Sequence, residues 1–146
     1  MTSPDENAVR QTVERFYHAV SEKSVTLLRD VVTPDWEYLP PPAGAVTSGP
    51  EQMTQMFDDL AKGLPDMKVT IVDLLVSGHR VGVRAMVSGT HHGELFGIAA
   101  TSKKVEFAIH SLHELRGDVI AKTWHLEDWL SAFRQIGQSP DLRGRG

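Results

Sequence analysis

The side chains best suited to chemistry lie in a predicted β-hairpin near the end of the chain. Arg116-Gly117-Asp118-Val119 separates two apolar-rich stretches, and Gly-Asp at the two central positions is typical of a two-residue hairpin turn. If Arg116 pairs with Val119 and the ladder continues without interruption, His110 lies directly opposite His125. Glu127 then projects from the same face. The pattern predicts an acid–base pair of histidines, because imidazole exchanges protons near neutral pH.

The other face of this predicted hairpin is apolar. Phe107, Ile109, Trp124 and Leu126 should project together from it. A patch of that size on a sheet usually meets a partner, so we expect a homodimer or a higher homo-oligomer with this face inside the contact. Two readings of the histidines stay open at this point, since a strand histidine is either part of a proton-transfer site or simply hydrogen-bonded in place.

A metal site is not expected from the histidines. Zinc needs three or four converging ligands, and in the predicted register His113 falls on the face opposite His110 and His125. His91 and His92 are adjacent, so only one of them can point into a pocket. The histidine pattern therefore predicts no metal cofactor.

Composition favours one globular domain. The chain has 146 residues, 40% hydrophobic content, a net charge of −4 and no cysteine. We expect one domain over residues 1–138 and a polar, disordered tail over residues 139–146. Scattered basic residues argue against nucleic-acid binding, and the lack of a long apolar run argues against membrane insertion. A cytoplasmic protein is therefore expected.

The order of the elements predicts an α+β fold. A first helix is predicted to begin at Pro4, with Ser3 as its cap, and its helical spacing continues to Val20. Further helices are predicted over residues 25–32 and from Pro50 to Leu60, and strand patterns mark residues 36–39, 67–76, 80–90, 104–115 and 119–127. Asp128 should cap a last short helix that ends near Gly137. Helices first and antiparallel strands afterwards indicate helices packed on a bent sheet that encloses a pocket.

Several segments resemble the SnoaL-like polyketide cyclases, which have the NTF2-like α+β cone fold. The matching pieces are residues 9–16, 49–51, 92–94 with Gly97, 109–110, 112–113 and 133–137. The resemblance implies closure of a ring in an aromatic polyketide, in antibiotic-type biosynthesis, by a cofactor-free intramolecular aldol reaction. A pocket Asp removes the proton in that family, and a His on the neighbouring strand holds the enolate.

The resemblance places His110 at the family His and His125 at the family Asp, with one extra residue between them. Either His125 is then the base, or Glu127 supplies the carboxylate. Loss of the Asp also fits a hydroxylation-linked member of the family that works with a reductase, and a non-catalytic binder of hydrophobic molecules is the third alternative. Phe16, Met56, Leu112 and His92 are the expected substrate contacts, the first two from positions where some cyclases have Tyr and Asn.

Overall fold

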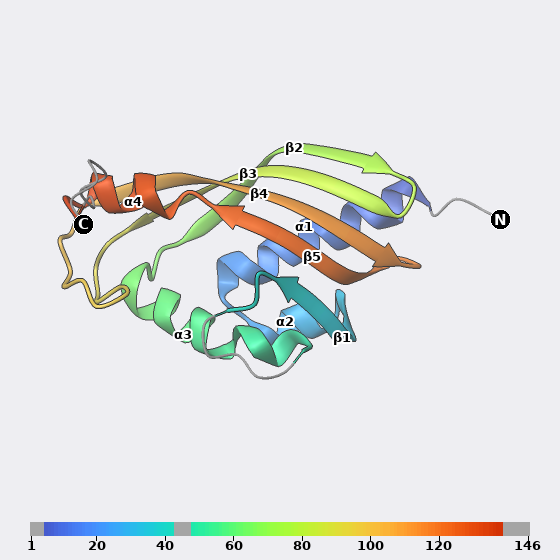
Figure 1. The fold of residues 1–146 in the computed structure, drawn as a ribbon, viewed down its shortest axis with the longest axis horizontal. Helices are drawn as coiled ribbons and strands as arrows, with labels where there is room; N and C mark the ends of the chain where they lie inside the picture. The colour runs from blue at the N-terminus through green and yellow to red at the C-terminus, as the bar shows by residue number, and fades with distance from the viewer. Residues whose placement is uncertain (1–4, 43–47, 139–146) are drawn as a thin grey trace, which may run out of the picture.

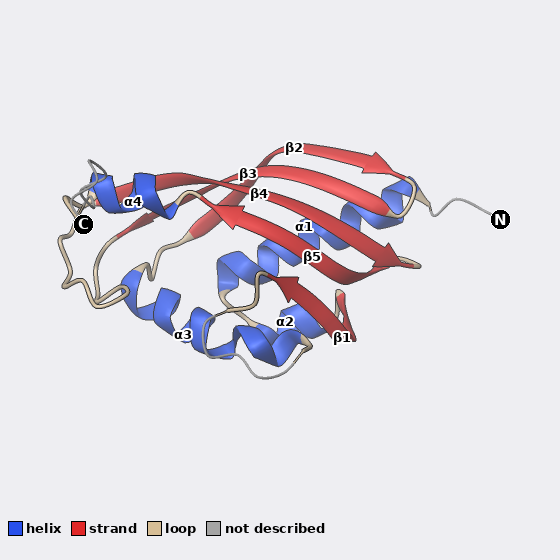
Figure 2. Cartoon of the chain, viewed as in Figure 1, coloured by secondary structure: helices blue, strands red, loops and turns tan. Residues whose placement is uncertain are grey.

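The computed structural model describes residues 5–42 and 48–138. Helices and strands follow in the order α1 (Glu6–Glu22), α2 (Val25–Arg29), β1 (Val32–Leu39), η1 (Pro50–Met53), α3 (Thr54–Gly63), β2 (Lys68–Ser77), β3 (Arg80–Thr90), β4 (Lys104–Arg116), β5 (Val119–Glu127) and α4 (Trp129–Gln135). The helices that precede β2 pack on one face of a curved sheet (Figure 1, Figure 2). The predicted α+β cone is confirmed.

The sheet is mixed. Its strand order is β1-β5-β4-β3-β2, and β1 runs parallel to β5 whereas the other neighbours are antiparallel. Strand β3 pairs with β4 along its whole length, from Arg80 opposite Glu114 to Thr90 opposite Lys104. We call the side that faces α1 and α3 the inner face and the other side the outer face.

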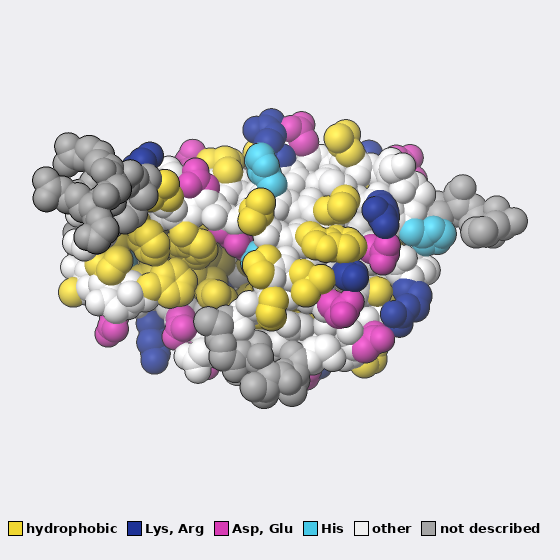
Figure 3. All heavy atoms as spheres, in the orientation of Figure 1, with side chains coloured by type: hydrophobic (Ala, Val, Ile, Leu, Met, Phe, Trp, Pro, Cys, Tyr) yellow, Lys and Arg dark blue, Asp and Glu magenta, His cyan; other side chains and the backbone are white. Residues whose placement is uncertain are grey.

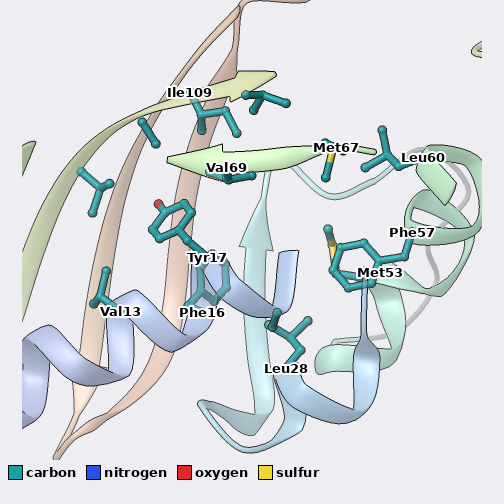
Figure 4. Close-up of a cluster of buried hydrophobic side chains, with 14 of the residues drawn as sticks. Val13, Phe16, Tyr17, Leu28, Met53, Phe57, Leu60, Met67, Val69 and Ile109 are labelled. Carbon is teal, nitrogen blue, oxygen red and sulfur yellow. The ribbon is translucent and has the colours of Figure 1, made fainter. Parts of the chain in front are cut away.

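Helix α1 supplies the first layer of the core. Val9, Val13, Phe16 and Tyr17 recur at helical spacing and are all buried. Figure 4 shows Val13, Phe16 and Tyr17 projecting from α1 toward the strands. The apolar stripe read from the sequence therefore sets which side of α1 meets the sheet.

A second cluster closes the other end of the core. Met53 and Phe57, from η1 and α3, lie near Leu60, Met67 and the start of β2 (Figure 4). This group is built from long, flexible or aromatic side chains that fill irregular space without polar atoms. It forms an apolar end wall for the space between α3 and the sheet.

The β4–β5 hairpin departs from its predicted register. Arg116 pairs with Val119 and Leu115 with Ile120, as expected, but Glu114 then pairs with Lys122. Ala121 is thus an extra residue, a β-bulge that slips the rest of the ladder by one. The predicted pairing of His110 with His125 is wrong.

Downstream of the bulge, His110 faces Leu126, and Ser111 faces His125. Because side chains alternate between faces, His110 points from the outer face while His125 and Glu127 point from the inner face. The predicted apolar face is also divided, since Phe107 and Ile109 are buried on the inner side whereas Leu126 is exposed on the outer side.

Both ends of the chain fall outside this description. Ser3 and Pro4, the predicted start of the first helix, and residues 139–146, the predicted polar tail, lie beyond the described residues. Within residues 5–42 and 48–138, every helix is too short or too polar to cross a lipid bilayer.

Candidate active site

A cavity of about 220 Å³ lies between the inner face of the sheet, α3 and the Pro40–Pro42 segment. Aliphatic, aromatic and thioether side chains make up most of its wall. They are Val20, Met53, Met56, Phe57, Leu60, Met67, Val69, Val87, Phe107, Ile109 and Trp129, with Pro40, Pro41 and Pro42 at one side. In the space-filling view, hydrophobic side chains surround a hollow between α3, α4 and the end of β5 (Figure 3). Such a wall suits an apolar or aromatic ligand.

Titratable groups enter the cavity wall at one place. His125 and Glu127 project side by side from β5, and Tyr38 reaches the same point from β1. His125 Nδ1 lies 2.6 Å from Glu127 Oε1 and 2.8 Å from Oε2. The two side chains are only 11% and 17% exposed, so this dyad is mostly withdrawn from water.

The other ring nitrogen of His125 is also engaged. His125 Nε2 lies 2.8 Å from the Pro40 carbonyl oxygen, which can only accept a hydrogen bond. Nε2 therefore carries a hydrogen, and a single further proton is shared between Nδ1 and the Glu127 carboxylate. The dyad is either an imidazolium–carboxylate ion pair or a neutral histidine beside a carboxylic acid.

Tyr38 supports the ion-pair form. Its ring stacks on His125 with a centroid distance of 3.7 Å and an interplanar angle of 6°, which suits a cationic imidazole. Its hydroxyl donates a hydrogen bond of 3.1 Å to Glu127 Oε1. Burial raises the pKa of Tyr38 well above its usual value, and the Glu127 charge raises it further, so Tyr38 remains a donor.

Behind the dyad runs a buried polar chain. Trp36 Nε1 donates to Thr123 Oγ1 at 3.0 Å, Thr123 Oγ1 meets His113 Nδ1 at 2.8 Å, and His113 Nε2 meets the Tyr17 hydroxyl at 2.8 Å. Burial lowers the pKa of His113 to about 3 and raises that of Tyr17, so both stay neutral. These hydrogen bonds connect α1, β1, β4 and β5 beneath the cavity.

With this geometry in place, relatives can be compared. The sequence profile of the SnoaL-like polyketide cyclases matches residues 11–136. The chain belongs to the SnoaL-like polyketide cyclase family. A search of the curated proteins finds no significant match.

Solved structures agree with this SnoaL-like assignment. TsrD from Streptomyces laurentii is 27% identical, with a TM-score of 0.80, covering 92% of this chain and 98% of that one. A candidate polyketide cyclase from Bacillus cereus ATCC 10987 is 26% identical, with a TM-score of 0.78 and coverages of 91% and 83%. AclR, a candidate hydroxylase from Streptomyces galilaeus, shares the fold at 16% identity, with a TM-score of 0.79 and coverages of 94% and 89%.

The structure sorts the predicted site residues of this SnoaL-like chain into two groups. Met56, His125 and Glu127 line the cavity together. His110 and Leu112 lie on the outer face, because they alternate with the buried row of β4, and the bulge in β5 turns His125 to the inner face instead. His92 is exposed on the segment after β3, with its backbone N–H bound to the Gly63 carbonyl oxygen.

Phe16, the remaining predicted contact, packs in the core rather than at the cavity. Its ring makes edge contacts with Tyr17, Trp36 and His113 at centroid distances of 5.0, 5.9 and 5.0 Å. Residues 5–42 and 48–138 contain no cluster of three or more potential metal ligands.

Sequence reasoning missed three participants: Tyr38, the Pro40 carbonyl and His113. Pro40 lies 85 positions from His125, so no local pattern links the two. For His113 a signal did exist. Val105, Phe107, Ile109 and Leu115 share its parity on β4, and that apolar row predicts the buried side of the strand.

Proposed function

We propose that this chain is a tailoring enzyme that closes a ring in an aromatic polyketide, as in antibiotic-type biosynthesis, with Glu127 as the proton acceptor. The observation that carries the proposal is the His125–Glu127 dyad, which together with the Tyr38 hydroxyl is the ionisable part of a largely apolar cavity wall. An apolar wall grips flat rings, and a single polar corner determines where the reacting carbonyl group lies.

The proposed reaction is an intramolecular aldol addition. Glu127 takes a proton from the carbon next to a ketone, and the resulting enolate carbon attacks a second carbonyl carbon of the same molecule. A new carbon–carbon bond forms, and the alkoxide recovers a proton from the dyad. Electrons and atoms balance without an oxidant, so the product is an isomer of the substrate, or its dehydrated form.

Glu127 is a better candidate for the base than His125. Both His125 nitrogens face acceptors, the carboxylate and the Pro40 carbonyl oxygen, so neither has a free lone pair. The carboxylate keeps lone pairs that are not used by His125 or Tyr38. When Glu127 accepts the proton, the positive charge of His125 stays beside the enolate and stabilises it.

Two alternatives predict different products. The His at the family Asp position favours hydroxylation with a reductase partner, but Glu127 places a carboxylate two residues further along the same strand face. A plain binder of hydrophobic molecules would return its ligand unchanged. The dyad favours ring closure over passive binding, since a buried, paired acid and base has no evident use in a plain binder.

The experiment is an incubation of purified protein with a polycyclic ketone ester, with and without a reductase, followed by mass spectrometry. Ring closure gives an unchanged mass or loss of water, whereas hydroxylation adds one oxygen. Glu127→Gln should lower the rate by roughly 10²–10⁴-fold. His110→Gln is the matched control, because His110 lies on the outer face and should not matter. Full activity of Glu127→Gln would refute the assignment.

We also infer that the outer face of the sheet meets a second copy of the chain. Leu75 and Leu126 are 73% and 74% exposed there, and Leu112 lies between them on β4. The nearby charges on this face are paired within the chain, as Arg84 with Asp73 and Arg80 with Glu114. Two identical faces can therefore approach without strong repulsion.

Sedimentation at micromolar concentration tests this contact. Wild-type protein should be a dimer or larger, and Leu126→Lys should shift it toward monomer. Leu27→Lys, which changes a leucine of α2 that is 38% exposed, should leave the assembly intact. A monomeric wild type would contradict the inferred contact.

A further inference from the structure

Phe96 is an exposed aromatic residue held in an unfavourable backbone conformation. It lies in a two-residue turn closed by hydrogen bonds between Leu95 and Ile98, with φ of 48° at Phe96 and 81° at Gly97. Positive φ suits Gly or Asn and is unfavourable for a bulky residue. The Phe96 side chain is nonetheless 45% exposed, so burial in the core does not explain its position.

The segment beneath this turn is firmly anchored. Leu95 is buried, and His91 is fully buried with hydrogen bonds to Thr101 Oγ1 and the Ile98 carbonyl oxygen. Gly93 packs so closely on α3 that an added Cβ would lie 2.0 Å from the Lys62 carbonyl oxygen. The turn therefore presents Phe96 from a fixed base.

An aromatic row leads from Phe96 to the cavity. Its ring meets Trp129 edge-on at 5.0 Å, and Trp129 in turn lies 4.6 Å from Phe107. Trp129 and Phe107 both line the cavity. Phe133 lies beside the Phe96 end of this row, with ring-centroid distances of 6.1 Å to Trp129 and 6.3 Å to Phe96. Phe96, Trp129 and Phe133 thus form an aromatic rim that continues the cavity wall to the surface.

The cavity is too small to enclose an extended ligand on its own. Its volume of about 220 Å³ is smaller than the roughly 300–1,000 Å³ typical of pockets that enclose a small-molecule ligand. A fused-ring ligand with its ketone at Glu127 extends beyond such a space. Resting on the proposed function, we propose that the aromatic rim is a second ligand subsite, which binds the fused rings that protrude from the cavity and selects for extended aromatic ketones.

Two aryl methyl ketones test the subsite by direct binding. Acetophenone has one ring and can be held within the cavity, whereas 2-acetylanthracene carries two further fused rings. Phe96→Asn removes the aromatic ring while suiting the positive φ, so the turn is retained. Phe96→Tyr keeps the ring and is the matched control. Dissociation constants are measured by calorimetry or tryptophan fluorescence.

We expect Phe96→Asn to weaken 2-acetylanthracene roughly three- to tenfold, the scale of one aromatic contact, and to leave acetophenone unchanged. Phe96→Tyr should bind both as wild type does. Equal affinity of wild type and Phe96→Asn for 2-acetylanthracene would overturn the subsite alone, as would an equal loss for both ketones. If wild type binds neither ketone, the proposed function fails together with the subsite.

Discussion

Lowering the pH from 7 to 5 should destabilise the protein through His113. This imidazole is fully buried and its pKa is lowered from 6.5 to about 3, while in the unfolded chain it titrates normally. Below pH 6.5 the unfolded state therefore binds a proton at His113 that the folded state does not bind. The free energy of unfolding falls as the pH drops through the window between 6.5 and 3.

The size of the effect follows from these two pKa values. Once His113 is protonated in the unfolded chain, each further pH unit costs about 1.4 kcal/mol until the folded pKa is reached. Between pH 7 and pH 5 the loss is about 2 kcal/mol, given a pKa of 6.5 unfolded and about 3 folded. That is a large part of the stability of a typical domain.

Urea unfolding of wild type and His113→Gln at both pH values isolates this contribution. The substitution leaves every other ionisable group in place, so the difference between the two pH-dependent losses belongs to His113. Wild type should lose about 2 kcal/mol more than the variant on going from pH 7 to pH 5. Equal losses would show that His113 is protonated in the folded protein, which would contradict a neutral His113 in the buried hydrogen-bond network.

Two further substitutions probe the packing around the site. Thr123→Val should lower the free energy of unfolding by about 2–4 kcal/mol in urea titrations, because Trp36 and His113 lose a buried hydrogen-bond partner. Thr123→Ser keeps the hydroxyl and should cost less. An equal cost for the two variants would contradict the hydrogen-bonded role of Thr123. Gly93→Ala should lower the melting temperature markedly, because the added Cβ would collide with α3. Gly82→Ala is the control and should leave the melting temperature nearly unchanged, because the space at its Cβ is open. Similar melting temperatures for the two variants would refute the close packing of Gly93 on α3.

Much of the fold was readable from the sequence because local signals agreed with tertiary packing. The predicted start of β3 at Arg80, the limits of β5 and the capping of α4 by Asp128 are all confirmed. Asp128 Oδ1 accepts from the Ser131 N–H, as the capping pattern predicts. Periodicity and capping are short-range properties, so a single sequence records them well.

The register of the β4–β5 hairpin was not readable in the same way. The turn at Gly117 sets the first pairs, but the bulge at Ala121 reverses the relation between the two strands beyond it. The extra residue relative to the family between His110 and His125 was the available signal of such a bulge. The Pro40 carbonyl contact had no counterpart in sequence, since it depends on how β1 lies beside β5.

Hydrogen–deuterium exchange at the carbon next to a ketone tests the central claim most directly. In D2O, 1-tetralone should lose its exchangeable α-protons faster with the protein than in buffer, as followed by proton NMR. Glu127→Gln should reduce the protein-dependent rate by roughly 10²–10⁴-fold, while His110→Gln leaves it unchanged. Exchange that is as fast in Glu127→Gln as in wild type would contradict a proton acceptor at Glu127.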